Sequence, residues 1–298
     1  MRVRVGVSNF GLALGSGGLR GAAHIGVLKS LERHGLQPVC LAGSSAGAVV
    51  AALYAAGYSV AALEELAIQL DASKIFDSNL SWRTLVSLAM GLLSRKCYQP
   101  SALPLGLIKG AAWERYLASL LGQQKFADLA LPTAIMAVDV ETGDGVAFAS
   151  REVAGVDVTL TGATVAQAVR ASSSIPGVFE PLQLYGFTLV DGAVRASVPA
   201  QLVRSLGAQV VVAIDLGYAG QREDKVDNLG EVISQSLHIL GEELTRCQLE
   251  QTADLIVRPR IYNVSLRDFQ RIPEIIERGE KAMEAQIPRL HQLLDPFH

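Results

Sequence analysis

Short apolar runs alternate with amphipathic stretches along most of this chain. The apolar runs are rich in β-branched residues and end in turn-forming residues, which is typical of buried strands. They lie at residues 3–14 (interrupted at 9–11), 36–42, 133–140, 146–149, 187–190, 209–216 and 254–257. Apolar positions three and four residues apart predict helices at residues 20–34, 46–58, 63–70, 165–172, 199–206, 228–252 and 274–294. This alternation predicts a three-layer α/β fold, with a mostly parallel sheet flanked by helices.

No internal repeat and no linker-like stretch divides the sequence, so we expect a single domain over residues 1–298. The least regular part is residues 71–115, which we expect to form a variable helical, lid-like segment of that domain. Within it, the apolar stretch 80–93 (LSWRTLVSLAMGLL) fits a mobile cover or a lipid-touching helix, and it equally fits ordinary core packing.

Composition narrows the class of protein. Half of the 298 residues are hydrophobic and 18% are charged, as in a folded protein with a large core. The formal net charge is −3 and the basic residues are scattered, which argues against a nucleic-acid binder. Cys40, Cys97 and Cys247 match no metal motif or disulfide framework, which favours a reducing, cytoplasmic location. Gly15 interrupts the apolar N-terminus, so we expect no signal peptide, and no apolar run has transmembrane length.

The sequence Gly43-Ser-Ser-Ala-Gly47 stands between a predicted strand and a predicted helix. In that context, G-x-S-x-G forms a sharp turn that exposes its central serine as a nucleophile. Gly43 and Gly47 would leave room where side chains would clash, and Ser45 would lie near the positive end of the following helix. Ser45 is therefore a candidate for attack on a carbonyl carbon. A tight packing turn between a strand and a helix would show the same glycines.

A second glycine-rich stretch, Gly15-Ser-Gly-Gly-Leu-Arg-Gly21, follows the first strand and opens a helix. It is not a dinucleotide fingerprint, because Arg20 stands where that motif has glycine, and it lacks the Gly-Lys-Ser/Thr of a P-loop. Small residues leave backbone N–H groups free to bind an anion or a carbonyl oxygen that gains negative charge. The loop is thus a candidate oxyanion hole for Ser45. Arg20 would brace this loop or bind a phosphate, or would simply pair with a nearby carboxylate.

A serine nucleophile needs a base, and no histidine of this chain is predicted to reach Ser45. The five histidines lie on helices or in the polar C-terminal tail, at His24, His34, His238, His291 and His298. Asp191 is the alternative base, because it follows a predicted strand and precedes Gly192, which lets the backbone turn. Burial would have to raise the pKa of Asp191 for proton transfer. Taken alone, Asp-Gly also fits a plain turn.

Four blocks together resemble the patatin-like phospholipase family, especially its small bacterial members. They are Gly15–Gly21 followed by His24-Ile-Gly-Val-Leu28, the turn Gly43–Gly47, Ala171-Ser-Ser-Ser-Ile-Pro-Gly177, and Asp191-Gly-Ala193, spanning residue 12 to about 216. The resemblance implies a Ser–Asp dyad without histidine, in which Ser45 is the nucleophile and Asp191 the base. It also implies oxyanion donors and loop supports, at Gly17, Gly18, Leu19, Arg20 and Gly192. Ser16 replaces the first glycine of the family's G-x-G-x-x-G window.

The resemblance implies a serine hydrolase that cleaves lipid acyl esters, as a phospholipase A, a lysophospholipase or a carboxylesterase. Its substrate would be a lipid or another acyl ester, with peripheral contact to a membrane as a further expectation. An acyl-thioesterase or general esterase is the alternative, and a non-catalytic lipid-binding module is a third. Asp139, Glu141 and Asp144 are more typical of a hairpin turn than of a calcium site, so we expect no metal and no cofactor. The sequence leaves the oligomeric state open.

Overall fold

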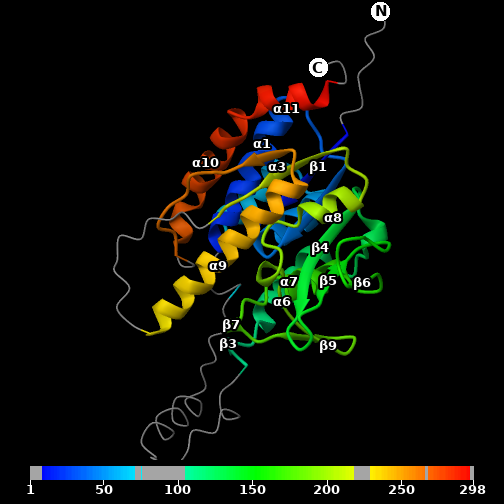
Figure 1. The fold of residues 1–298 in the computed structure, drawn as a ribbon, viewed down its shortest axis with the longest axis vertical. Coiled ribbons are helices and arrows are strands. Elements are labelled where there is room, and N and C mark those ends of the chain that lie inside the picture. The colour runs from blue at the N-terminus through cyan, green and yellow to red at the C-terminus, as the bar shows by residue number, and fades with distance from the viewer. Residues whose placement is uncertain (1–8, 71–74, 76–104, 218–228, 266–267, 296–298) are drawn as a thin grey trace, which may run out of the picture.

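A computed structural model of the chain describes residues 9–70, 75, 105–217, 229–265 and 268–295. At its centre is a sheet of nine described strands (Figure 1). Seven of them follow the order β11 (Leu255–Val257), β10 (Val210–Ile214), β1 (Phe10–Leu14), β2 (Cys40–Ser44), β4 (Thr133–Asp139), β5 (Gly145–Phe148) and β6 (Val158–Leu160). The other two are β9 (Phe187–Asp191), which pairs with β4, and β8 (Leu182–Leu184), which pairs with β9. The strands from β11 to β4 are parallel, whereas β5 and β9 run antiparallel to β4.

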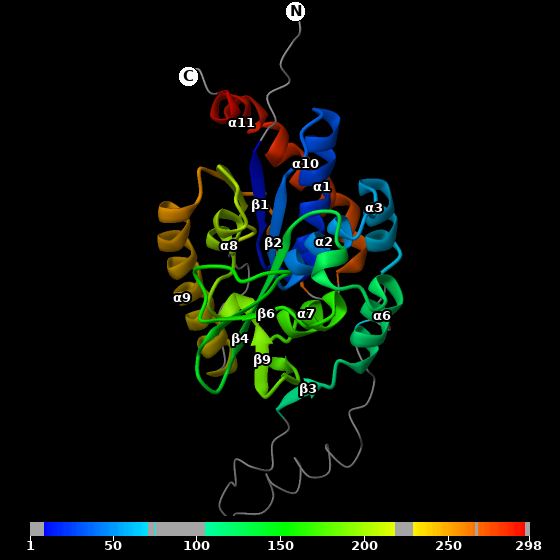
Figure 2. The ribbon, with the colours of Figure 1, turned by 90° about the vertical axis from the view of Figure 1, so that its right-hand side faces the viewer.

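Helices cover both faces of this sheet, as Figure 2 shows from its edge. One face packs against α1 (Ala23–Arg33), α2 (Ala46–Ala55), α3 (Val60–Ile68), α6 (Ala111–Leu121), α7 (Val165–Ser172) and α10 (Ile272–Glu284). The other face packs against α8 (Ala200–Ser205) and α9 (Leu229–Thr252). The predicted three-layer α/β fold with a mostly parallel sheet is therefore confirmed.

Alternate residues of the central strands enter two separate cores. The core on the side of α1 and α2 receives the larger side chains, which include Leu12, Leu14, Leu41, Ile135 and Ile214. The core on the side of α8 receives mostly smaller ones, which include Ala13, Cys40, Ala42, Met136 and Val211. Because both faces are buried, these strands are apolar throughout instead of alternating with polar residues. This is the pattern from which the sequence predicted buried strands.

Helices α1 and α10 cross at a point where their backbones touch. A Cβ atom added to Gly26 would lie 1.9 Å from the carbonyl oxygen of Ile276, and one added to Gly279 would lie 2.0 Å from that of Ala23. The two glycines therefore set how closely α10 packs on α1. This contact matters for function, because α1 follows the glycine-rich loop and Ile272, at the start of α10, lines a cavity beside the predicted nucleophile.

Replacing either glycine of this crossing by alanine is expected to lower the free energy of unfolding by about 3 kcal/mol, because the helix backbones must separate. Gly241→Ala is a matched control, since Gly241 also lies inside a helix but an added Cβ meets nothing within 4 Å. That change should raise stability by up to about 1 kcal/mol. Urea unfolding of the three variants measures the effects. Equal stabilities of Gly26→Ala and Gly241→Ala would contradict the close crossing.

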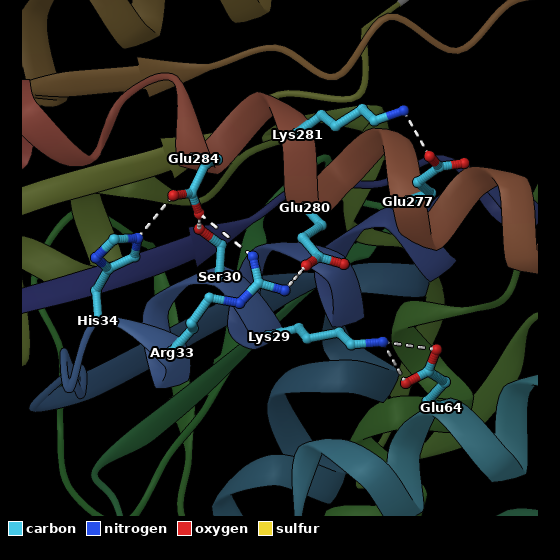
Figure 3. Close-up of polar contacts among 9 residues, drawn as sticks. All are labelled: Lys29, Ser30, Arg33, His34, Glu64, Glu277, Glu280, Lys281 and Glu284. Atoms are coloured by element: carbon cyan, nitrogen blue, oxygen red, sulfur yellow. Dashed lines mark hydrogen bonds and ion pairs between the residues drawn. The ribbon is translucent and has the colours of Figure 1, made fainter.

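Polar side chains flank the same helix pair (Figure 3). The hydroxyl of Ser30 and Nε2 of His34 lie 2.9 and 2.8 Å from the carboxylate of Glu284, and Arg33 pairs with Glu280. Surface pairs of this kind contribute only about 0–1 kcal/mol each. They favour one orientation of α10 on α1, while the apolar contacts and the glycine crossing supply most of the stability. His34 is thereby placed as a surface partner of Glu284.

Several predicted boundaries differ in the structure. The predicted helix 274–294 is two helices, α10 and α11 (Ile287–Leu294), because Pro288 starts a new helix after a bend. The helix predicted from residue 20 begins as a 3₁₀ turn, η1 (Gly18–Ala22), before α1. The interruption predicted at residues 9–11 is wrong in part, since Phe10 and Gly11 open β1. Residues 3–8 lie outside the described residues.

Most of the predicted variable segment 71–115 lies outside the described residues. Its last part forms β3 (Gly106–Ile108) and the first turn of α6. Strand β3 pairs with β7 (Gly177–Phe179) in a small second sheet that the sequence pattern did not predict. The lid-like role of the segment and the single domain over residues 1–298 stay predictions.

Candidate active site

Strands β2 and β9 bring Ser45 and Asp191 together along one edge of β4. Strand β2 pairs with β4 as far as Ser44, opposite Met136, and the chain then turns into α2 at Ser45. Strand β9 approaches from the other direction and ends with Asp191 opposite Ala137, the next residue of β4. The two strands therefore end head to head at adjacent positions. The two side chains are close enough for the hydroxyl of Ser45 to lower the pKa of Asp191.

The backbone at Ser45 adopts a strained turn between β2 and α2. Its φ of 53° and ψ of −120° are values that a residue other than glycine seldom adopts. A Cβ atom on Gly43 would lie 2.5 Å from the carbonyl oxygen of Gly47, and one on Gly47 would lie 2.0 Å from that of Leu14. Both positions therefore require glycine. The N–H of Ser45 donates to Oγ of Ser172 at 2.8 Å, which ties the turn to α7.

Asp191 is buried, with 3% of its surface exposed. Its Oδ1 accepts a hydrogen bond from the N–H of Ala193 at 2.8 Å, and its own N–H donates to the carbonyl oxygen of Ser174 at 3.0 Å. Burial raises the pKa of Asp191 from 3.8 to about 6, although the hydrogen bonds from the serine hydroxyl and from Ala193 oppose this rise. The following Gly192 fits tightly, since a Cβ there would lie 2.4 Å from the carbonyl oxygen of Met136.

The start of the glycine-rich loop is tied to the sheet and to the turn before α8. The N–H of Gly15 donates to the carbonyl oxygen of Ile214 at 3.0 Å. Ser16 makes two contacts with Ser197, one from its N–H to the carbonyl oxygen at 2.9 Å and one between the two hydroxyls at 2.7 Å. The serine that replaces the family's first glycine thus has a partner of its own. These bonds fix the loop relative to the end of β1.

The next residues of the loop face the same cavity as the serine of the elbow. Gly18 and Leu19 line that cavity together with Ser45. In the described part of the chain, no acceptor is bonded to the N–H of Gly18 or Leu19, which stand at the start of η1. Gly17 is not among the lining residues, and its carbonyl oxygen accepts the N–H of Arg20 at 3.1 Å. The structure therefore brings two of the three predicted oxyanion residues to Ser45.

His24 holds the loop from the first turn of α1. It is fully buried, and its Nε2 lies 2.7 Å from the carbonyl oxygen of Gly15. Burial lowers the pKa of His24 to about 4, so the ring is neutral and Nε2 carries the proton that it donates to Gly15. The sequence places this histidine on a helix and does not predict that it reaches Ser45, but its bond to the loop was not foreseen. Its closeness to the glycine-rich stretch in sequence was the available signal.

Arg20 joins the glycine-rich loop to the turn after β10. Its guanidinium donates to the carbonyl oxygens of Leu216, at 3.0 Å, and of Gly217. The sequence left three roles open for Arg20: bracing the loop, binding a phosphate or pairing with a carboxylate. These bonds to backbone carbonyl oxygens match the bracing role. The loop is thereby held from both sides, by His24 and by Arg20.

A mostly apolar cavity of about 180 Å³ lies beside Ser45. Helices α1, α2, α3, α6 and α10 contribute to its wall. The lining side chains of these helices are aliphatic and aromatic, and they include Ile25, Val50, Leu63, Trp113 and Ile272. A cavity of this kind fits an apolar chain whose polar group lies at Ser45. No sequence pattern predicts this cavity, because its wall combines helices that are far apart in the chain.

The acidic residues near residue 140 belong to a hairpin turn, as predicted. The carboxylate of Asp139 accepts the N–H of Thr188 at 3.0 Å and the hydroxyl of Thr142 at 2.9 Å, and Glu141 accepts the hydroxyl of Thr188 at 2.6 Å. The antiparallel pairing of β4 and β5 confirms the hairpin. Among the residues that the structure describes, no group of three or more His, Cys, Asp or Glu could hold a metal ion. That no cofactor is needed stays a prediction.

Comparisons with known proteins bear on these features. An uncharacterized NTE family protein of Mycobacterium tuberculosis is 30% identical over 220 residues, which are 73% of this chain and 52% of that protein. Lysophospholipase NTE1 of Candida albicans is 26% identical over 226 residues, which are 75% of this chain and 14% of that protein. The chain thus spans about half the length of the mycobacterial relative and much less of the fungal one.

One solved structure shares the fold, and one family model matches the sequence. The structure of VipD from Legionella pneumophila matches this chain with a TM-score of 0.53 and 14% sequence identity. The match covers 97% of this chain and 67% of VipD, and it shows that the two share a fold. The model of the family described as patatin-like phospholipase matches residues 12–204, more than half of the chain. This range contains all four of the motif blocks that suggested the resemblance. The chain therefore belongs to the patatin-like phospholipase family.

Proposed function

We propose that this protein hydrolyses acyl esters of lipids through a dyad of Ser45 and Asp191. The carboxylate of Asp191 accepts the proton of Ser45 Oγ while that oxygen attacks the ester carbonyl carbon. The carbonyl oxygen becomes negative and binds the N–H groups of Gly18 and Leu19. As the carbon–oxygen bond of the ester breaks, Asp191 returns the proton to the leaving alcohol. A water molecule, deprotonated by the same carboxylate, then releases the fatty acid from Ser45.

The observation that carries this proposal is the buried carboxylate that lies beside the serine of a strained elbow and whose pKa responds to that serine's hydroxyl. A carboxylate with a pKa near 6 is a better base at neutral pH than an ordinary aspartate. The histidines nearest in sequence to the loop have other partners: His24 bonds to Gly15, and His34 lies against Glu284. The carboxylate is thus the base that the described residues offer.

The cavity supports the class of substrate. Its wall is aliphatic and aromatic, so an acyl chain would be transferred from water to an apolar surface when its ester reaches Ser45. One relative bears the name lysophospholipase. We therefore assign a lysophospholipid or another single-chain acyl ester as the preferred substrate.

A panel of acyl donors tests the proposal directly. The purified protein is assayed with p-nitrophenyl esters of increasing chain length, lysophosphatidylcholine, diacyl phosphatidylcholine and an acyl-coenzyme A thioester. We expect the oxygen esters to be cleaved, the longer chains faster, and a fluorophosphonate probe to label the wild type but not Ser45→Ala. Faster cleavage of the thioester would favour a thioesterase. Absence of both labelling and turnover would favour a lipid-binding module.

Arg20 provides a test of the oxyanion loop. Arg20→Met removes the bonds to Leu216 and Gly217, so the N–H groups of Gly18 and Leu19 lose part of their fixed position. We expect the rate on a soluble p-nitrophenyl ester to fall by about tenfold, less than for complete loss of one donor. Arg20→Lys, which keeps one donor, should fall less. Unchanged rates in Arg20→Met would mean that the loop keeps its shape without the guanidinium.

A further inference from the structure

Helix α9 exposes a group of aliphatic side chains on its N-terminal half. Six of them are between 44% and 66% exposed: Val232, Ile233, Leu237, Ile239, Leu240 and Leu244. Together they expose roughly 500 Å² of apolar surface, within the range of about 300–600 Å² found for the largest and often functional patches of monomers. We call this set the outward face of α9.

The outward face points away from the body of the protein. At about 100° per residue, its six side chains fall within an arc of about 160° around the helix axis. Thr245 and Leu249 are 4% and 0% exposed and mark the side that packs on the body, almost opposite that arc. A surface helix normally buries its apolar side, and these turns of α9 do the reverse. In Figure 1 the yellow, N-terminal end of α9 projects away from the other coloured elements.

This end of α9 lies at the edge of the sheet that carries the candidate active site. Helix α9 ends at Thr252, just before β11, and β11 runs parallel to β10, β1 and β2. Helix α9 therefore runs against the strands, so its N-terminal half lies near their carboxyl ends, where Ser45 follows β2. Further along α9, Nε2 of Gln248 donates to the carbonyl oxygen of Arg195 at 3.1 Å, four residues after Asp191.

The charge pattern of α9 indicates what covers the outward face. Residues 232–241 contain no Asp, Glu, Lys or Arg, and His238 is their one titratable residue. In the remainder of the helix, acidic residues outnumber basic ones. Anionic membranes attract clusters of Lys and Arg, which α9 lacks. The outward face therefore suits the boundary between hydrocarbon and uncharged or zwitterionic headgroups.

We propose that the outward face of α9 docks on the surface of a zwitterionic lipid bilayer, beside which the active site takes its substrate. The proposed lipid hydrolysis gives this docking its purpose, and in that respect the docking rests on the proposed function. The docking itself needs neither Ser45 nor Asp191. The apolar side chains would enter the boundary between headgroups and acyl chains. Among the described residues, no helix has both the length and the hydropathy that a membrane-spanning segment needs.

Flotation with vesicles of pure phosphatidylcholine tests the docking. We expect the full-length protein to float with the vesicles equally at 0.1 and 0.5 M NaCl, and Ser45→Ala to float as the wild type does. Leu237→Gln combined with Leu240→Gln should lower the partition coefficient about tenfold or more, because two exposed leucines leave the apolar face. His238→Gln, on the other side of the same helix, is the matched control and should float normally. All variants except Ser45→Ala should cleave a soluble short-chain ester at the wild-type rate.

Several results would overturn the proposal. They are a wild type that stays unbound, a double variant that floats normally, and binding that needs anionic lipid and disappears at high salt. Sedimentation velocity supplies one more: a wild-type dimer that the double variant converts to a monomer, with unchanged flotation, would assign the outward face to a second copy of the chain. Because Ser45→Ala is measured for flotation and the leucine variants for soluble-ester cleavage, failure of docking and failure of the proposed chemistry are distinguishable.

Discussion

Ser45→Ala is expected to lower ester hydrolysis by at least about 10⁴-fold. Removal of a serine nucleophile costs about 10⁶-fold in a well-studied protease, and the remaining oxyanion donors account for what is left. Here the hydroxyl is also the group that acts on the pKa of Asp191. The measurement is the initial rate on a soluble p-nitrophenyl ester, with active protein counted by fluorophosphonate labelling of the wild type.

Ser44→Ala is the matched control for this change. Ser44 is the preceding residue and is fully buried, and its hydroxyl has no hydrogen-bond partner among the described residues. Loss of an unpaired buried hydroxyl should leave the rate within about threefold and the melting temperature unchanged or slightly higher. If Ser45→Ala kept more than about 1% of the activity while Ser44→Ala lost it, the nucleophile would have been assigned to the wrong residue.

The central part of this site could be predicted from sequence, because it depends on local geometry. The elbow needs glycine on both sides of Ser45 whatever the rest of the fold does, since neighbouring backbone leaves no room for a Cβ. Asp191 followed from elimination of the histidines and from its place at the end of a strand. The strands themselves were predicted because both faces of the sheet are buried, which gives continuous apolar runs.

Other parts of the site depend on contacts between distant residues, and no local pattern encodes them. Strand β9 is antiparallel to β4 and meets β2 end to end, a pairing that a short apolar run does not indicate. Ser172 bonds to the elbow across 127 positions of sequence, and although it lies in the motif block 171–177, nothing in that block indicated this bond. The outward face of α9 was part of a correctly predicted helix. Its exposure could be recognised only when Thr245 and Leu249 showed which side meets the body.

Asp191→Asn is expected to lower kcat/KM at pH 8 by at least about 100-fold, the usual effect of losing a general base. The wild type should also show an acid limb that reports this carboxylate. Because burial raises the pKa of Asp191 to about 6, most molecules carry the ionised carboxylate above that pH. Below it, kcat/KM should fall about tenfold per pH unit. A flat profile between pH 5 and 8, or full activity in the Asn variant, would assign the base to another group.

The same variant separates catalysis from stability. The pKa of Asp191 in the folded protein, about 6, lies above its ordinary value of 3.8, so between these values the native state binds more protons than the unfolded chain. The free energy of unfolding therefore falls as pH rises through this window, by about 3 kcal/mol in total. Asparagine carries no charge and keeps an acceptor for Ala193. We therefore expect Asp191→Asn to need more urea for unfolding than the wild type at pH 8, with the difference largely lost at pH 4. A less stable Asn variant at pH 8 would mean that the hydrogen bonds of the carboxylate outweigh the cost of burying its charge.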